Sequence, residues 1–248
     1  AWFSQSLHMS VAAFCATGFA VAGLHAYFLL KGKNREFHLK AFRIAVIFGI
    51  FGAVLAPISG DVAAKSVAKR QPIKLAAMEA HFETEKGASF LIGGIPDEKA
   101  ETVKYGLKIP KLLSFLVDGN PNSEVKGLKD FPKEHWPPVA VTHFAFQIMI
   151  FFGTVMMGIS VLYLFALFFK KNWLEKHWLL KLFIIATPFG YIALEAGWTV
   201  TEVGRQPWII YGIMKTAEAV TPMPGIQYSF YLFTLIFISL SLIIIFLL

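Results

Sequence analysis

The sequence predicts an all-α membrane protein, a polytopic helix bundle with five transmembrane helices and a helical extracytoplasmic loop. Hydrophobic residues make up 56% of the 248 residues and charged residues only 16%, a balance that excludes an ordinary soluble domain. Five apolar stretches are long enough to span a bilayer, which takes about 20 helical residues. They cover residues 8–30, 41–59, 139–169, 180–198 and 227–248.

Three features within these stretches have structural consequences. Pro57 and Pro188 fall inside or near a stretch, and a kink there is tolerable where neighbouring helices satisfy the freed carbonyl groups. The stretch 139–169 is longer than a bilayer requires, so we expect it to tilt or to protrude. The single cysteine, Cys15, lies among apolar residues, and we expect it to be a small packing residue.

Charge in the connecting segments predicts the orientation in the membrane. The segments after the first and third stretches are strongly basic and should be cytoplasmic. The long segment 60–135 holds twelve basic and eleven acidic residues and should lie outside. The N-terminus is then outside and the C-terminus cytoplasmic. The basic residues are Lys31, Lys33, Arg35, Lys40, Arg43, Lys170, Lys171, Lys176 and Lys181, against Glu36 and Glu175. The basic residues of the cytoplasmic segments account for the net charge of +7. The charge therefore gives no reason to expect a nucleic acid partner.

The segment between the second and third stretches is the candidate for a subdomain outside the membrane. Apolar residues at three- and four-residue spacing predict a helix over 71–85, and Pro110 in a first turn predicts another over 109–117. The segment cannot bury much core alone, so we expect it to lie on the membrane surface or on a partner. Turns are predicted between the two helices at Gly87, Gly93-Gly94 and Pro96-Asp97.

Acidic residues at the end of the fourth stretch precede a rigid cationic turn. Glu195 and Glu202 are followed by Gly204-Arg205-Gln206-Pro207-Trp208. Carboxylates at the end of a membrane helix need a partner or water, and the turn suits a charged, bulky cofactor. An interfacial anchor explains the turn equally well, with tryptophan in the aromatic belt and arginine on lipid headgroups.

His8 and Met149 lie toward the outer ends of the first and third stretches. Imidazole and thioether are the axial pair of many low-spin haems. The alternative is that Met149 only packs, as most methionines in apolar helices do.

These motifs occur together in an order that resembles the C-terminal half of subunit I of the cytochrome bd-type quinol oxidases, over essentially all of the chain. The turn resembles the family's haem-site signature, and the outer segment resembles its quinol-binding loop. The other matching motifs are His8-Met-Ser-Val-Ala-Ala-Phe14, Tyr27-Phe-Leu-Leu-Lys-Gly32, Lys74-Leu-Ala-Ala-Met-Glu79-Ala-His-Phe-Glu83-Thr84, Gly94-Ile-Pro-Asp97, Val125-Lys-Gly-Leu-Lys129 and Phe144-Ala-Phe-Gln-Ile-Met149.

The resemblance implies two haem sites. His8 and Met149 would ligate the iron of a low-spin haem b. Glu202 would ligate the iron of a high-spin haem b, with Trp198 packed between the haems. Arg205 would pair with a haem propionate or with Glu202.

The resemblance also implies a quinol site lined by Lys74 and Glu79. A carboxylate can accept a quinol proton, and a cation can stabilise the resulting charge. Their five-residue spacing puts the two side chains about 140° apart on a helix, so they would flank a site. The alternative is a solvated charge pair on a loop helix, outside the bilayer.

Two departures limit what can be transferred. Gln147 stands where the family usually has arginine, so a positive charge near the low-spin haem is missing and the haem potential should be lower. The family's N-terminal half, which supplies the ligands of the oxygen-binding haem d, has no counterpart in this sequence. Haem d or a third haem b would therefore be held by a partner.

The expected organisation is transmembrane helices 1–2 in residues 1–59, the quinol-binding loop in 60–138 and transmembrane helices 3–5 in 139–248. The expected function is quinol oxidation in a prokaryotic cytoplasmic membrane, with electrons passed through haem to reduce dioxygen to water. The expected partners are an N-terminal-half subunit and a subunit II-like membrane protein. The alternatives are a haem b and quinone-binding electron-transfer subunit of another membrane complex, or a cofactor-poor structural half.

Overall fold

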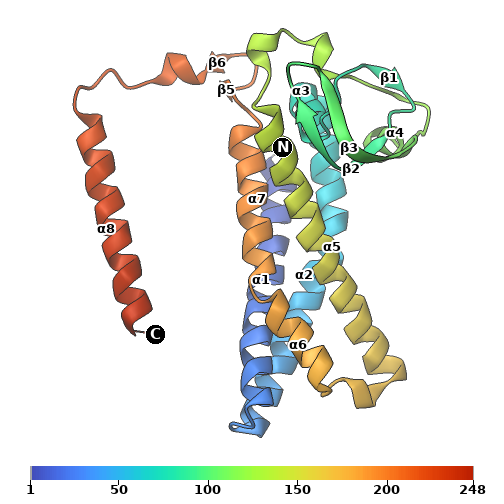
Figure 1. Ribbon diagram of the computed structural model, residues 1–248, viewed down its shortest axis with the longest axis vertical. Coiled ribbons are helices and arrows are strands. Elements are labelled where there is room, and N and C mark those ends of the chain that lie inside the picture. Colours follow the sequence, from blue (N-terminus) through green and yellow to red (C-terminus); the bar gives the residue numbers. More distant parts are fainter. Residues whose placement is uncertain (1, 248) are drawn as a thin grey trace.

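The computed structural model describes residues 2–247, and most of them are helical (Figure 1). Four helical segments of membrane-spanning length lie side by side. They are α1 (Trp2–Leu30), α2 (Arg35–Arg70), α5 (Val139–Phe169) and a segment made of two consecutive helices, α6 (His177–Ala186) and α7 (Phe189–Val203). A fifth helix, α8 (Ile226–Leu247), stands apart, and none of its residues is buried. Within residues 2–247, five helical segments thus have the length and composition of membrane spans, which confirms the predicted fold class.

The second helix extends further than the apolar stretch from which it was predicted. α2 keeps Pro57 inside it and continues past residue 59 to Arg70. The added turns are rich in alanine, and Lys65 and Asp61 form an ion pair of 2.7 Å across one turn. The residues after 59 therefore favour a helix, although they are too polar to be predicted as part of an apolar stretch. The helix thus continues into the segment that was predicted to lie outside the membrane, and the mixed helical and β structure begins at residue 71.

Residues 71–138 form a mixed helical and β subdomain, here called the cap. Its helices are α3 (Pro72–Met78) and α4 (Leu112–Asp118), with single 3₁₀ turns at Leu128–Asp130 and Lys133–His135. Its main β element is an antiparallel hairpin of β2 (Phe90–Asp97) and β3 (Thr102–Ile109), in which Phe90 pairs with Ile109 and Asp97 with Thr102. The short strands β1 (Glu85–Lys86) and β4 (Glu124–Val125) also pair.

The hairpin was not predicted, and both cap helices differ from their predicted bounds. Gly93 and Gly94 lie inside β2 rather than at a turn. The turn is made instead by Asp97, whose Oδ1 accepts hydrogen bonds from the amides of Lys99 and Ala100. The first helix stops at Met78 instead of 85, and the second begins at Leu112 instead of 109.

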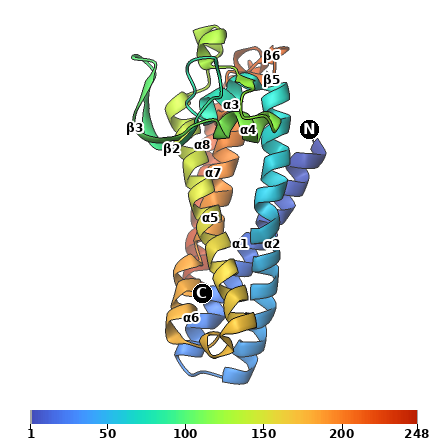
Figure 2. The same ribbon diagram turned by 90° about the vertical axis from the view of Figure 1, so that its right-hand side faces the viewer.

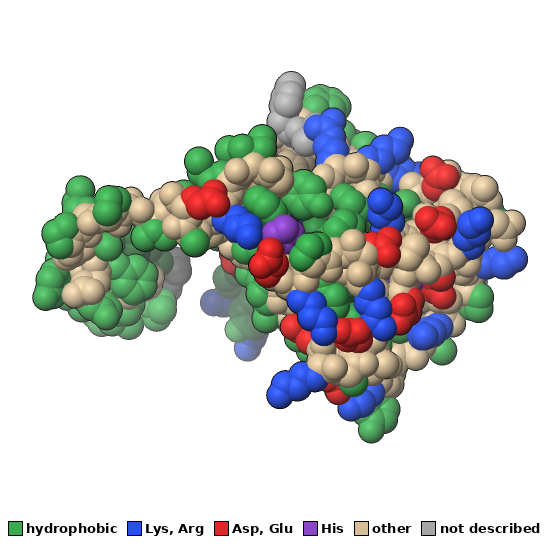
Figure 3. All heavy atoms as spheres, turned by 90° about the horizontal axis from the view of Figure 1, so that it is seen from above, with side chains coloured by type: hydrophobic (Ala, Val, Ile, Leu, Met, Phe, Trp, Pro, Cys, Tyr) green, Lys and Arg blue, Asp and Glu red, His purple; other side chains and the backbone are tan. Residues whose placement is uncertain are grey.

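The chain termini and loops alternate between the two ends of the bundle (Figure 1). α1 starts at the cap end, where the turn after α7 also lies, and α8 ends at the opposite end. Both basic segments lie at that opposite end, where Glu175 pairs with Arg35 and Arg43. Seen from the cap end, acidic and basic side chains are interspersed over the cap, whereas α8 presents mostly hydrophobic side chains (Figure 3).

The hydrophobic core fills the half of the bundle away from the cap. Phe19, Phe42 and Phe183 are each 1% exposed, and their rings meet there. Cys15 packs in the same core, as expected, and is 4% exposed. Toward the cap α1 diverges from α5 and α7 (Figure 2), so the packing is less complete in the half that carries His8 and Met149.

Close helix contact depends on small residues. A Cβ added at Gly190 of α7 would lie 2.3 Å from the Cα of Ala16 in α1. Such an approach between backbones is open only to glycine and drives helix association in membranes.

We expect Gly190→Ala to lower the thermal midpoint of the purified protein by several degrees, because α7 must move away from α1 at a cost of about 1–3 kcal/mol. Gly153→Ala on α5 is the matched control, since an added Cβ there meets nothing within 4 Å. Thermal unfolding in detergent measures both. Equal midpoints for the two variants would contradict the close α1–α7 contact.

Candidate functional site

The lysine of the cap helix α3 is buried against the end of α7. Pro72 starts α3, and every residue from Ile73 to Ala80 is buried. Lys74 is 5% exposed, and its Nζ donates a hydrogen bond of 3.2 Å to the carbonyl of Thr201 in the last turn of α7. The last carbonyl groups of a helix lack helical partners and carry partial negative charge. Lys74 therefore supplies a hydrogen-bond donor to a carbonyl group at the end of α7. Its burial excludes the alternative of a solvated charge on a loop helix.

Lys74 also lies close to the residues that follow α7. Burial and the Arg205 guanidinium lower the pKa of Lys74 to about 8, and the Glu202 carboxylate opposes that shift. Glu202 and Arg205 form an ion pair with each other. The fold thus brings three sequence-predicted site residues, Lys74, Glu202 and Arg205, into one electrostatic group at the cap end of α7.

Glu79 ends the same helix on its other side. It is 5% exposed, and its Oε2 has no hydrogen-bond partner. Burial raises the pKa of Glu79 to about 8, against the effect of a backbone hydrogen bond from Leu91. Lys74 faces α7 and Glu79 faces β2, so the two side chains lie on different sides of α3, as their five-residue spacing indicates. Both proton affinities lie near neutral pH, where a group can both take and release a proton.

Two side chains of α5 hold the cap in place. The ring nitrogens of His143 lie 2.8 Å from the carbonyl oxygen of Met78 and 3.1 Å from that of Gly93. The Gln147 amide donates to the carbonyl of Leu91 and accepts from the amide of Gly93, at 2.9 and 3.0 Å. His143 is fully buried. The bonds from Gln147 to β2 were not predicted.

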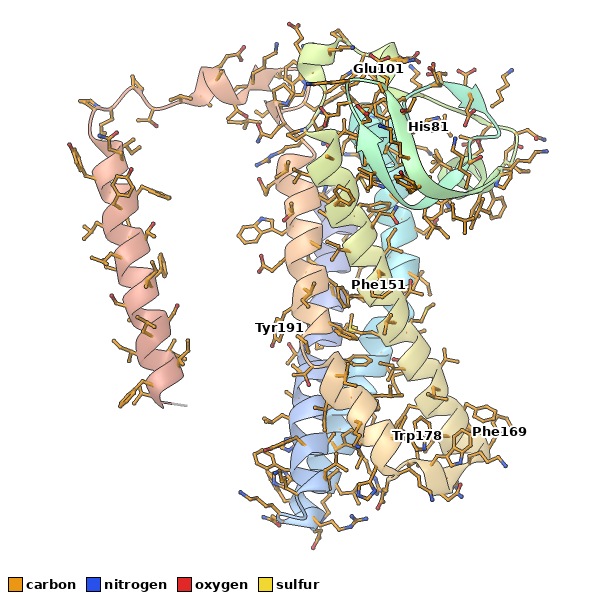
Figure 4. The ribbon with its side chains drawn as sticks, in the orientation of Figure 1. His81, Glu101, Phe151, Phe169, Trp178 and Tyr191 are labelled. Carbon is orange, nitrogen blue, oxygen red and sulfur yellow. The ribbon has the colours of Figure 1, made fainter. Side chains whose placement is uncertain are left out.

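One face of α7 carries polar and aromatic residues away from the bundle. Tyr191, Glu195, Trp198 and Glu202 follow each other at spacings of four, three and four residues, which places them on one helix face. Tyr191 and Trp198 are 52% and 59% exposed, and Tyr191 points to the side on which α8 stands (Figure 4). Two carboxylates thus lie on an outward face of α7, which together with α6 has the length of a membrane span.

The ring of His8 is oriented by a neighbour on α2. Its Nδ1 lies 2.9 Å from the hydroxyl of Ser59, and that hydroxyl donates its own proton to the carbonyl of Ala56. The Ser59 oxygen must then accept, which puts the ring proton of His8 on Nδ1 and leaves a lone pair on Nε2. That is the tautomer in which an oriented imidazole binds a metal. Gly60 borders the ring, with an added Cβ at 3.3 Å from Cε1.

Met149 lies on α5 against α7. Its sulfur would be 3.0 Å from a Cβ added at Gly197, so the glycine makes room for the thioether. His8 packs on α2 and Met149 on α7, and α1 diverges from α5 at this level (Figure 2).

The donor types present are ones that haem iron takes from proteins. Among residues 2–247 no group of three His, Cys, Asp or Glu side chains gathers to hold an ion. An iron porphyrin brings four nitrogen ligands of its own and takes only axial ligands from the protein. A histidine with a free Nε2, a half-buried thioether and a carboxylate at a helix end can supply such axial ligands.

Comparisons with known proteins agree on one family. The family described as cytochrome bd terminal oxidase subunit I matches residues 1–248. A putative cytochrome bd menaquinol oxidase subunit I of Bacillus subtilis is 35% identical, over 97% of this chain and 55% of that protein. A cytochrome bd ubiquinol oxidase subunit 1 of the same organism is 32% identical, over 87% of this chain and 48% of that protein.

A solved structure, the bd oxidase from Geobacillus thermodenitrificans, superimposes with a TM-score of 0.87 at 35% identity. The match covers 96% of this chain and 55% of the solved chain. The chain therefore spans about half the length of the relatives it matches.

We expect Glu79→Gln to stabilise the protein at high pH only. Between its ordinary pKa of 4.5 and about 8, the folded protein keeps the Glu79 proton that the unfolded chain has lost. The free energy of unfolding of the parent protein therefore falls as the pH rises through this window. The variant should melt about 5 °C higher than the parent at pH 9 and at nearly the same temperature at pH 5.

Glu83→Gln is the matched control, because the Glu83 side chain is 66% exposed and its removal should produce no such pH-dependent difference. Thermal melts of the three proteins across this pH range provide the measurement. A Glu79→Gln midpoint that tracks the parent at both pH values would mean that Glu79 is solvated.

Proposed function

The chain belongs to the cytochrome bd terminal oxidase subunit I family, and we propose that it oxidises a membrane quinol at the cap and passes the electrons to haem in the bundle. Dioxygen is then reduced to water in the assembled enzyme. The observation that carries this proposal is the burial of Lys74, which reaches from the cap helix to the end of α7 beside Glu202 and Arg205. The residues proposed for the quinol site and those proposed for the high-spin haem therefore lie close together.

At the quinol site, Glu79 takes the proton of a quinol hydroxyl, and the positive charge of Lys74 on the other side of α3 favours the negative charge that develops on the quinol. The support for these roles is physical. Both groups are buried, and both have a pKa of about 8. Each of them can therefore take up or release a proton near neutral pH. A solvated pair would have an acid far below and an amine far above neutrality.

The haem sites lie along the bundle below the cap. His8 and Met149 would hold a low-spin haem b. Glu202 would hold a high-spin haem b, with Trp198 at its edge and Arg205 paired to the carboxylate or to a propionate. Haem, when bound, accepts and passes on single electrons. Gln147 supplies no positive charge near the low-spin haem, and its amide is engaged by β2, which favours a lower haem potential.

The exposed face of α7 supports a partner polypeptide. Glu195 lies seven residues below Glu202, roughly 10 Å deeper along the helix. A carboxylate at that depth is costly against lipid and needs protein, water or a cofactor beside it. We infer that a subunit corresponding to the family's N-terminal half covers this face and carries the oxygen-binding haem, d or b. A subunit II-like membrane protein completes the complex.

The distribution of basic residues between the two ends of the bundle supports the proposed orientation of the chain in the membrane. Both basic connecting segments lie at the end opposite the cap, which the positive-inside rule assigns to the cytoplasm. The cap, the N-terminus and the turn after α7 then lie outside a prokaryotic cytoplasmic membrane.

We expect His8→Ala and Met149→Leu each to remove the low-spin haem band from the difference spectrum of the purified complex, while the complex still assembles. His25→Ala on α1 and Met157→Leu on α5 are matched controls, because each makes the same change on the same helix nearer the opposite end. An unchanged low-spin band in both ligand variants would contradict the assignment.

We expect Glu202→Ala to remove the high-spin haem and abolish oxygen uptake, and to leave the low-spin haem reducible by quinol. Glu218→Ala is the control, since that glutamate is exposed in the segment before α8. Haem extraction measures the haem content, difference spectra measure the reduction of the low-spin haem by quinol, and an oxygen electrode measures oxygen uptake. Normal oxygen uptake by Glu202→Ala would rule out the carboxylate as an iron ligand.

A further inference from the structure

A cavity of about 370 Å³ lies between the end of α3 and the β2–β3 hairpin. Figure 4 labels His81 and Glu101, which line it from the α3 side and from the hairpin turn. The ionisable residues that line it are Glu79, His81, Glu83, Glu85, Glu101 and Lys108. A cavity of this size and polarity has room for several water molecules.

A tight turn brings Glu79 and His81 to the same cavity. The amide of His81 donates to the carbonyl of Ala76, and the amide of Ala80 donates to that of Ala77, the paired hydrogen bonds of a Schellman motif. Ala80 takes the left-handed conformation, with φ of 49°, where glycine is usual. This unfavourable backbone conformation reverses the chain, so that two titratable side chains separated by one residue face one space.

Each of these two side chains presents an unpartnered atom inside the protein. Glu79 Oε2 and His81 Nε2 are both buried without a hydrogen-bond partner, while a backbone hydrogen bond to Val125 engages the His81 ring. Burial lowers the pKa of His81, so its ring is neutral at neutral pH and able to accept a proton. The charged groups that act on the ring are Glu83 and Glu85, which oppose this shift, and Lys108, which adds to it.

The cavity leads from these two groups to an acidic surface. Glu83 and Glu85 are exposed. Glu101 lies at the base of the hairpin turn, where it pairs with Lys129 and Lys133. A proton released from His81 therefore meets carboxylates and water outside rather than the apolar bundle.

We propose that His81 carries protons from Glu79 into this cavity, and so serves as the proton exit of the quinol site. The proposal rests on the proposed quinol oxidation. Each quinol loses two electrons, which go to haem iron in single steps, and two protons, which leave one after the other. Each proton moves from a quinol hydroxyl to the Glu79 carboxylate, then to Nε2 of His81, then to cavity water. Both groups return to their starting forms after each proton.

The order of proton affinities makes the imidazolium a short-lived carrier. Glu79 holds a proton more tightly than His81, so transfer to the ring is uphill and the proton passes on to water rather than staying. Without the ring, Glu79 must release its proton to the cavity water directly, and this release should be slow because its Oε2 is buried and has no hydrogen-bond partner. In this relay His81 does not contact quinol. Removal of the His81 ring should therefore lower kcat and leave KM unchanged.

The test uses the assembled complex and measures quinol oxidation at saturating quinol. We expect His81→Gln and His81→Ala to lower kcat at least tenfold, with KM and haem content unchanged. Imidazole added to His81→Ala should restore kcat, because the emptied space adjoins the cavity. Imidazole should not rescue Glu79→Gln, and His177→Gln, an exposed histidine at the opposite end, should keep the parent kcat.

The outcomes separate the two proposals. Failure of the parent complex to oxidise quinol, or parent kcat in Glu79→Gln, would reject the proposed quinol chemistry itself. If both behave as expected, parent kcat in the two His81 variants would overturn the relay. A loss of kcat that imidazole does not restore in an assembled His81→Ala complex would overturn it as well, because it would assign His81 a purely structural role.

Discussion

Four polar contacts between backbone groups of the cap and the side chains of His143 and Gln147 fix the position of the cap on the bundle. They are needed because the cap has little apolar interior of its own. Its buried apolar residues form two small clusters, one around Ile73 and one around Leu75. Backbone groups at the end of α3 and in β2 are desolvated where they meet α5, and each would be costly if unpaired. The two side chains satisfy them and set the distance between α3 and α7.

That distance decides the chemistry of Lys74. With α3 held in place, its amine reaches a carbonyl of the last turn of α7, and Gly204 leaves room for the side chain, since an added Cβ would lie 3.3 Å from the Lys74 Cε. The same burial leaves Glu79 without a counterion on the opposite side of α3. Two groups that would be ordinary surface charges on a free loop thus acquire proton affinities near neutrality. The account of quinol oxidation depends on this burial.

Hydropathy was sufficient to predict the five spans and the grouping of loops at the two ends, because length and charge in a bilayer leave few alternatives. It failed where local structure depends on tertiary contacts. Gly93-Gly94 indicated a turn, yet β2 continues through them because α5 binds its backbone. The end of α3 carried no glycine signal, since Ala80 takes the left-handed position. Site residues could be named by family resemblance, but their burial could not be derived from sequence, and neither could the cavity that Glu79 shares with His81.

The most direct test of the account is the rate at which quinol reduces the low-spin haem in a rapid-mixing experiment with Lys74→Met. Methionine fills similar space without the charge, and Lys99→Met on the exposed hairpin turn is the control. The account predicts that haem reduction by quinol slows at least about tenfold, while haem content and reduction by dithionite stay unchanged. Reduction by quinol at the parent rate would contradict the claim that the buried cap helix is the site of quinol oxidation.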